Sequence, residues 1–217
     1  MNDVVQQIAY TNNNRNKIIP VHGTLKKKFG NLKDSKKEKL LLTDEAIYSL
    51  SYHSDATMLS MIIKNKFGTN ITITDGTANV GGNTLSFAKY FKKVYAIELD
   101  KVNFNALNNN IKVYGYTNVK CIFGDCTEKI FNLKQDIIFL DPPWGGKTYK
   151  NQLKIDLYLN NIELSVFCNK IFRNTSTNLI ILKVPNNFNK ESLNNINCKH
   201  CDIIQFKKYL IILLSLI

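Results

Sequence analysis

From residue 43 onward, the chain alternates short apolar runs with longer stretches in which apolar residues recur at helical spacing. The short runs predict strands at residues 71–74, 94–97, 119–123, 137–140 and 179–184. The helical spacing predicts helices at residues 56–64, 83–91 and 102–114, and a largely helical segment at 155–172. Two last apolar runs, 203–206 and 209–216, predict a closing β-hairpin.

Strands that are apolar along their whole length, with helices between them, are typical of a parallel sheet that is buried on both faces. We therefore predict an α/β fold: a three-layer sandwich whose mostly parallel, doubly wound sheet ends in an antiparallel hairpin. Ligands of such folds bind at the carboxyl ends of the strands. Acids stand at four of these ends, Asp75, Glu98, Asp141 and, after one glycine, Asp125. Such acids can also be plain turn or helix-capping residues.

The first 42 residues differ from the rest in charge. They hold nine basic and three acidic residues, so their net charge of +6 is half of the +12 of the whole chain. Their apolar residues follow no helical or strand period, so we predict a basic N-terminal arm or extension at 1–42 and one domain at 43–217. The charge favours a polyanionic partner such as nucleic acid, although a lysine-rich surface can also serve only to keep a protein in solution.

The cysteines and the N-terminal residues indicate a cellular compartment for the protein. Five cysteines are an odd number, and the first residues lack the apolar core of a secretion signal, so we expect reduced thiols and an intracellular protein, cytoplasmic or nuclear. Abundant Lys, Asn and Ile fit A/T-rich codons, as in a parasite or a virus, and a virus would place the protein in its host cell. Cys198 and Cys201 lack a second close pair, so no metal site is expected. The apolar run 210–214 is too short to span a bilayer, so no membrane contact is expected.

The first strand runs into the turn ITDGTANVGGNT (73–84), which has features of a nucleoside site. Gly81 and Gly82 let the backbone approach a ligand, and the helix that follows offers free N–H groups. Glu98 ends the next strand, where a carboxylate can bind the hydroxyls of a ribose. The strict G-x-G-x-x-G pattern is absent, so S-adenosylmethionine fits better than NAD. The alternative is a glycine-rich turn of another kind of α/β enzyme.

In this interpretation, Asp75 faces the amino-acid end of the cofactor and Asp125 accepts a hydrogen bond from the adenine amine. Glu98 holds the ribose, and the glycines give clearance. The predicted cofactor-binding residues are Asp75, Gly76, Thr77, Gly81, Gly82, Asn83, Thr84, Glu98, Asp125 and Cys126.

The stretch IIFLDPPWGGKTYK (137–150) predicts the reaction site. Methyl transfer to the exocyclic amine of a base requires a clamped base and acceptors for the hydrogens of that amine. Asp141 and the carbonyl of Pro142 are suitable acceptors, and Trp144 offers a face on which a base can stack. We predict these three as the catalytic residues. The alternative is a buried tryptophan beside a tight turn.

The motif DPPWGG (141–146), with DGTANVGGNTLSFA (75–88) and NNNIKVYG (108–115), resembles the RNA cap guanine-N2 methyltransferases, the trimethylguanosine synthase family. The resemblance covers residues 45–217 and includes LKVPNN (182–187). It implies a class I S-adenosylmethionine-dependent methyltransferase that acts on N2 of a 7-methylguanosine cap, with capped RNA as its partner. The substrate-binding residues that it implies are Trp144, Tyr149, Asn187, Lys36, Lys37 and Lys39.

The chain departs from that family at two positions. Asp141 stands where a serine is expected, and Asn186 stands where a phosphate-binding arginine is expected. Two other interpretations therefore stay open. One is an enzyme acting on guanine N2 or adenine N6 in structural RNA or DNA, and the other is a non-catalytic RNA-binding subunit that retains the fold. In each case we expect a monomer.

Overall fold

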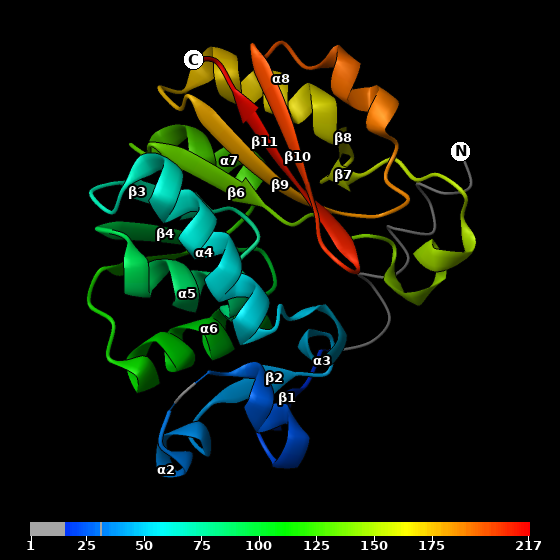
Figure 1. The fold of residues 1–217 in the computed structure, drawn as a ribbon. Coiled ribbons are helices and arrows are strands. Elements are labelled where there is room, and N and C mark those ends of the chain that lie inside the picture. The colour runs from blue at the N-terminus through cyan, green and yellow to red at the C-terminus, as the bar shows by residue number, and fades with distance from the viewer. Residues whose placement is uncertain (1–15, 31) are drawn as a thin grey trace. The chain divides into compact units, whose positions relative to one another are not determined.

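The computed structural model describes residues 16–30 and 32–217 (Figure 1), so the predictions for residues 1–15 lie outside the described residues. The chain divides into two compact units. The N-terminal unit comprises Asn16–Ile130, and Phe131–Ile217 belongs to the C-terminal unit. The predicted boundary between an arm at 1–42 and a domain at 43–217 stays a prediction.

Three parallel strands, in the order β3-β4-β5, form the sheet of the N-terminal unit. They are β3 (Thr72–Asp75), β4 (Lys93–Glu98) and β5 (Val119–Phe123). In β3 and β4, nearly every residue after the first is buried, as expected for strands that are covered on both faces. The three strands predicted in this part of the chain are confirmed.

The predicted helices of this unit are also confirmed. They are α4 (His53–Phe67), α5 (Gly82–Tyr90) and α6 (Lys101–Tyr114), and a short α7 (Cys126–Lys129) follows β5. α6 begins where the Asp100 carboxylate accepts hydrogen bonds from two backbone N–H groups of its first turn, and it ends at Gly115, whose φ of 78° is left-handed. α4 and α5 contact each other, and the hydroxyls of Ser60 and Ser86 lie 2.7 Å apart between them.

The segment before α4 is folded into short elements. These are β1 (Ile18–Pro20), η1 (Gly23–Lys28), α2 (Asp34–Lys37), β2 (Leu41–Thr43) and α3 (Ala46–Ser49). β1 and β2 pair as an antiparallel hairpin in which Ile19 lies opposite Leu42.

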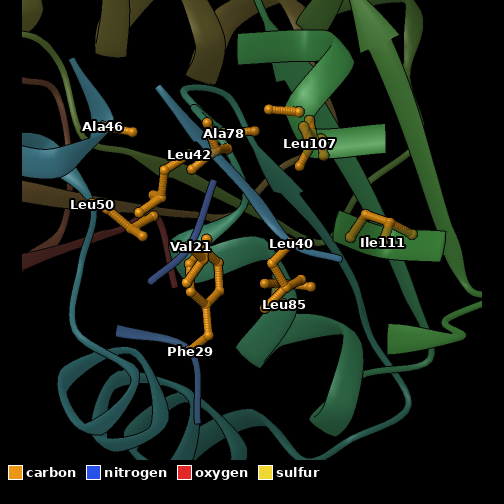
Figure 2. Packing of buried hydrophobic residues seen from close by; sticks show 13 residues of the cluster. Val21, Phe29, Leu40, Leu42, Ala46, Leu50, Ala78, Leu85, Leu107 and Ile111 are labelled. Carbon is orange, nitrogen blue, oxygen red and sulfur yellow. The ribbon is translucent and has the colours of Figure 1, made fainter. Parts of the chain in front are cut away.

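Apolar residues of this segment belong to the core of the N-terminal unit (Figure 2). Phe29 and Leu42 are buried in one cluster with Leu107 of α6. The buried Asn110 side chain of α6 adds polar contacts, because its Nδ2 donates to the carbonyl of Leu41 at 2.8 Å and its Oδ1 accepts from the N–H of Leu41 at 2.8 Å. The described part of the basic extension is therefore an integral part of this unit.

The larger sheet of the C-terminal unit has four strands in the order β10-β11-β9-β6. They are β6 (Ile137–Leu140), β9 (Leu179–Pro185), β10 (His200–Gln205) and β11 (Tyr209–Ser215). β6 and β9 are parallel, whereas β11 is antiparallel to both β9 and β10, which confirms the predicted closing hairpin. The helices of this unit are η3 (Gly146–Asn151), α8 (Leu164–Asn174) and η4 (Lys190–Asn195), and η2 (Ile130–Asn132) begins at the last residue of the N-terminal unit.

The prediction of a largely helical segment at 155–172 is wrong in its first part. The helix α8 begins only at Leu164 and is preceded by a small hairpin of β7 (Tyr158–Leu159) and β8 (Ile162–Glu163). Asn160 and Asn161 turn the hairpin with φ values of 44° and 62°. A two-residue turn with two positive φ angles suits a tight hairpin, and asparagine tolerates that conformation, so the turn overrides the helical spacing.

Candidate active site

Asp75 closes β3, and its buried carboxylate holds the turn that follows. Its Oδ2 accepts a hydrogen bond from the Thr84 hydroxyl at 2.6 Å, and its Oδ1 accepts one from the N–H of Thr77 at 3.3 Å. The carboxylate thereby ties the turn that contains Gly76 to the first part of α5. Three of the predicted cofactor residues thus form one hydrogen-bonded set, while their contact with a ligand stays a prediction.

The two glycines at the start of α5 are required by close packing. Gly81 has a left-handed φ of 106°. A Cβ atom on Gly82 would lie 2.6 Å from Cδ1 of Leu50 and 3.2 Å from the backbone nitrogen of Ser51. The missing side chain of Gly82 therefore makes room for the segment after α3. The clearance for a ligand that the sequence predicted stays a prediction.

Two side-chain hydrogen bonds fasten the same segment to the glycine turn. Asn83 Nδ2 donates to the hydroxyl of Ser51 at 3.1 Å, and Asn79 Nδ2 donates to the hydroxyl of Ser49 at 3.3 Å. The predicted cofactor residue Asn83 thus binds Ser51 from the start of α5.

Glu98 ends β4, and both of its carboxylate oxygens accept backbone hydrogen bonds. Oε2 accepts from the N–H of Asn79 at 2.7 Å, and Oε1 accepts from the N–H of Asp100 at 2.8 Å. Burial is the main cause that raises the pKa of Glu98 to about 7; the nearby carboxylates of Glu45 and Asp100 also act to raise it, and the two backbone hydrogen bonds act to lower it. A carboxylate oxygen can accept more than one hydrogen bond, so the group retains capacity for ribose hydroxyls.

Asp125 and Cys126 lie at the start of α7. The Asp125 carboxylate caps this helix by accepting from the N–H of Thr127 at 2.7 Å. The Cys126 thiol is buried, and burial raises its pKa; the negative charges of Asp125, Glu98 and Asp75 raise it further. The structure thus brings three of the predicted acids close enough to Cys126 for their charges to act on it.

Two apolar side chains stand exposed beside these acids, and the sequence analysis missed them. Leu99 follows Glu98 and is 61% exposed, and Phe123 ends β5 and is 45% exposed. Phe104 flanks Phe123 with ring centroids 5.4 Å apart, and the Lys101 ammonium lies 4.5 Å from the Phe123 centroid. Large apolar side chains left exposed at strand ends offer a surface for a planar base. Their position next to the predicted acids was the signal that could have found them.

In the C-terminal unit, Asp141 follows β6 and forms an ion pair with Lys183 of β9. The Lys183 Nζ donates to Asp141 Oδ2 at 2.6 Å, and the two side chains are 7% and 17% exposed. Burial raises the pKa of Asp141, whereas the Lys183 ammonium lowers it. The Trp144 indole lowers it as well, although its geometry falls short of a hydrogen bond.

Trp144 is half-buried and packs against Tyr149 of η3. The ring centroids lie 5.4 Å apart at an interplanar angle of 81°, which is an edge-to-face contact. The buried indole Nε1 makes no hydrogen bond within the part of the chain that the structure describes. The Lys183 ammonium lies 5.5 Å from the Trp144 centroid. The structure therefore brings the predicted residues Asp141 and Trp144 together at Lys183, and Tyr149 packs against Trp144.

The turn after Asp141 is shaped by proline and glycine. Pro142 is buried, and Gly145 and Gly146 have left-handed φ values of 87° and 70°. Asn187 supports the chain that follows, since its Nδ2 donates to the carbonyls of Tyr149 and of Gln152 at 2.8 Å each. The predicted contact of Asn187 with substrate stays a prediction, as do the catalytic roles of Asp141 and Pro142.

The predicted phosphate-binding lysines lie in and just after α2. Lys36 and Lys39 are exposed, whereas Lys37 lies 3.8 Å from the Asp34 carboxylate in a weak ion pair. A neighbouring pair joins Lys26 to Glu38 at 3.2 Å. Exposed lysines are available to an incoming phosphate, and the role of all three predicted lysines stays a prediction.

The sequence analysis also missed Lys183. The lysine interrupts LIILKVP (179–185), a strand that is otherwise apolar and is buried throughout. A charged residue inside a buried strand is costly unless it is paired, so its presence in that pattern was a signal for a buried counter-charge. The partner, Asp141, is 42 residues away in the chain.

Residues 16–30 and 32–217 contain neither a membrane-spanning helix nor a metal-binding cluster. No helix there is long and apolar enough to cross a membrane. No group of three or more His, Cys, Asp or Glu side chains there is arranged to hold a metal ion. The expected intracellular location and the expected monomer stay predictions.

Comparison with known sequences identifies the family. The family described as RNA cap guanine-N2 methyltransferase matches residues 70–211. A protein of Acanthamoeba polyphaga mimivirus is 32% identical over 87% of this chain and 87% of its own length, and this viral relative agrees with the composition. The trimethylguanosine synthase of Schizosaccharomyces pombe is 28% identical over 61% of this chain and 59% of its own. That of Saccharomyces cerevisiae is 27% identical over 55% and 39%.

Solved structures share the fold. The 16S rRNA guanine-N2 methyltransferase of T. thermophilus, in complex with AdoMet and guanosine, is similar with a TM-score of 0.59 and 17% identity, over 74% of this chain and 42% of its own. A methyltransferase of Geobacter sulfurreducens has a TM-score of 0.59 and 14% identity, over 79% and 83%. The predicted α/β, Rossmann-like class is confirmed by these likenesses. Together with the family match over more than half of the chain, they lead to one conclusion: this chain belongs to the RNA cap guanine-N2 methyltransferase family.

Proposed function

We propose that this protein transfers a methyl group from S-adenosylmethionine to the N2 amine of a 7-methylguanosine RNA cap. The observation that carries the proposal is the half-buried Trp144 ring beside the Asp141 carboxylate, in a chain of this family. A base stacked on the indole is held flat, and the carboxylate gives its amine an acceptor. This combination suits an amine as the methyl acceptor.

The cofactor is assigned to the N-terminal unit, because the groups that a nucleoside requires gather there. Glu98 accepts hydrogen bonds from the ribose hydroxyls, and Asp125 accepts one from the adenine amine. Phe123 and Leu99 cover the apolar faces of the adenine. Asp75 holds the turn against which the amino-acid end lies. When bound, S-adenosylmethionine supplies a reactive methyl group on its sulfonium.

The residues of the C-terminal unit hold and orient the base. Trp144 stacks on it, and the positive charge of 7-methylguanosine strengthens the contact with the indole. Asp141 and the carbonyl of Pro142 accept hydrogen bonds from the amine, and this orientation turns the nitrogen lone pair toward the methyl donor. Much of the rate then comes from alignment of the reacting atoms.

The rest of the capped RNA is assigned to charged and polar groups. The exposed Lys36 and Lys39 contact phosphates, and Lys37 joins them when its weak pair with Asp34 opens. The Tyr149 hydroxyl contacts the cap phosphates, and Asn187 holds the backbone of η3 in place for it. Capped RNA is the proposed partner.

The test is methylation of a free cap nucleotide. The protein is incubated with S-adenosylmethionine and either 7-methylguanosine diphosphate or guanosine diphosphate, and the products are weighed by mass spectrometry. We expect one or two added methyl groups on the first nucleotide and little on the second, because a cationic base binds the indole better by about 1–2 kcal/mol. Equal turnover of both nucleotides contradicts the cap proposal.

One observation favours a second candidate, a guanine N2 methyltransferase acting on structured RNA. The Lys183 ammonium already lies 5.5 Å from the Trp144 centroid. A cationic base therefore gains less from stacking on this ring, and a neutral guanine is at a smaller disadvantage. Structured RNA and free cap nucleotide offered in parallel separate the two candidates. Methylation of the RNA alone favours the second.

A further inference from the structure

Lys183 is a charged residue held inside a sheet. It lies in β9, and its side chain is 7% exposed. Isolated ammonium groups are costly to bury, so a buried lysine is expected only where a partner compensates its charge. The partner here is the Asp141 carboxylate at 2.6 Å, which follows the neighbouring strand β6.

The register of the sheet explains why these two side chains meet. Phe139 of β6 lies opposite Ile181 of β9, and the pairing continues toward the carboxyl ends of both strands. The pairing ends where Leu140 lies opposite Leu182, and Asp141 and Lys183 are the next residues along the two segments. Their contact is therefore set by the strand pairing and belongs to the sheet itself.

Two aromatic rings confine the ammonium from other directions. Its Nζ lies 5.1 Å from the ring centroid of Tyr209 in β11 and 5.5 Å from that of Trp144. Both rings present their π-systems to the charge, which favours a cation at this place. The Lys183 ammonium thus contacts both the Asp141 carboxylate and the ring of Trp144, on which the base is proposed to stack.

We propose that Lys183 is a positioning residue for methyl transfer, which keeps the Asp141 carboxylate ionised and oriented toward the amine of the base. This inference rests on the proposed function. An ionised carboxylate offers only acceptors to an amine, whereas a protonated one turns an O–H donor toward it. The amine donates hydrogen bonds, so only the ionised form suits it. Lys183 acts through Asp141 and supplies no proton.

The charges around Asp141 support this role. Burial raises its pKa, and the Lys183 ammonium is the largest influence that lowers it. The strands β6 and β11 pair with β9 in this unit. Asp141 follows β6, β11 contributes the Tyr209 phenol near the Lys183 ammonium, and Tyr149 of η3 contacts Trp144. Without the lysine, burial dominates, and the carboxyl binds a proton at higher pH than in the native protein.

The first test uses Trp144, the one tryptophan of the chain, as a reporter that needs no turnover. Its fluorescence is titrated with pH in the native protein, in Lys183→Met and in Lys183→Met combined with Asp141→Asn. We expect the titration step of Asp141 to move to higher pH by at least about one unit in Lys183→Met, and to vanish in the double variant. Equal midpoints in the native protein and in Lys183→Met overturn the proposal.

The second test uses the rate. In Lys183→Met, turnover should begin to fall at a higher pH than in the native protein and should recover as the pH rises, because each unit of pH below the pKa of Asp141 lowers the ionised fraction of its carboxyl about tenfold. Lys183→Arg should retain most of the turnover, and Lys183→Met should add little to the loss caused by Asp141→Asn. A loss that is independent of pH and additive with Asp141→Asn indicates a purely structural role and overturns the proposal.

Two controls keep the outcomes distinct. Thermal unfolding shows whether Lys183→Met is folded, and Lys183→Gln replaces it in both tests if it is not. If the native protein methylates no guanine substrate while the fluorescence step still moves, the proposed function fails and the control of Asp141 by Lys183 stands. If methylation occurs and the step does not move, the inference about Lys183 fails by itself.

Discussion

The Glu98 carboxylate accepts a hydrogen bond from the backbone N–H of Asn79 at 2.7 Å, which joins the end of β4 to the turn after β3. Asn79 has a φ of 50°, a left-handed conformation that asparagine adopts more readily than most residues. Burial raises the pKa of Glu98 to about 7. The proposed ribose-binding turn is therefore anchored to a group that titrates near neutral pH.

Glu98 should make stability fall as the pH rises. The folded protein holds this proton up to a pKa of about 7, whereas the unfolded chain releases it at about 4.5. The stabilisation is present below the lower value and is lost as the pH rises through the upper one. We expect Glu98→Gln to remove roughly 3 kcal/mol of this pH dependence, measured as the free energy of unfolding in urea. Equal pH dependence in both proteins would show that Glu98 does not titrate in this window.

The same substitution should change cofactor binding. Ribose hydroxyls bind a charged carboxylate more strongly than a neutral group, so affinity for S-adenosylmethionine should rise with pH through about 7 in the native protein. In Glu98→Gln the affinity should be weaker at high pH by about 1.5–3 kcal/mol and nearly independent of pH. Calorimetric titration measures both. Unchanged affinity would mean that the nucleoside lies elsewhere.

Gly82→Ala should destabilise the N-terminal unit. The added Cβ would lie 2.6 Å from Leu50 Cδ1 and 3.2 Å from the Ser51 nitrogen, so the segment after α3 must move. Overpacking of this kind costs about 1–3 kcal/mol in the free energy of unfolding. The matched background is Leu50→Ala, which removes the nearest atom. There the added cost of Gly82→Ala should be clearly smaller, and additive costs in the two backgrounds would contradict the packing explanation.

Trp144 allows a direct test of base stacking, because it is the single tryptophan of the chain and tryptophan fluorescence therefore reports on it alone. A 7-methylguanosine nucleotide should quench it, and a guanosine nucleotide should quench it less. Trp144→Ala should weaken base binding by about 1–3 kcal/mol, and Trp144→Phe should weaken it less because a ring remains. S-adenosylmethionine affinity is the control and should stay unchanged. A folded protein that is quenched by no nucleotide would show that Trp144 is only a packing residue.

The exposed lysines near α2 should govern the salt dependence of RNA binding. We expect Lys36→Ala combined with Lys39→Ala to weaken capped RNA and to flatten the slope of log affinity against log salt by about 0.7 for each lost phosphate contact on a single strand. Filter binding at several salt concentrations measures this slope. The control is Lys190→Ala, an exposed lysine of η4. An equal change in the control would mean that only the overall charge matters.

Local patterns in the sequence were enough for most secondary structure. Apolar runs and helical spacing depend on neighbouring residues alone, so they predicted β3, α5, β4, α6 and the closing hairpin. They failed at residues 155–163, where the two residues of the turn, Asn160 and Asn161, adopt positive φ angles that a periodicity does not encode. The DPPWGG motif and the strand-end acids were also visible, because a motif is by nature local.

Only the tertiary structure decided which distant groups meet. The pairing of Lys183 with Asp141 depends on the register of β6 with β9, and the pairing of Glu98 with Asn79 depends on the turn after β3. The need for glycine at position 82 is likewise explained only by its packing against Leu50, 32 residues earlier in the chain. Burial and counter-charge act through space, so the pKa of a carboxyl group follows from its folded surroundings, whereas the position of that group at the end of a strand can be read from the chain.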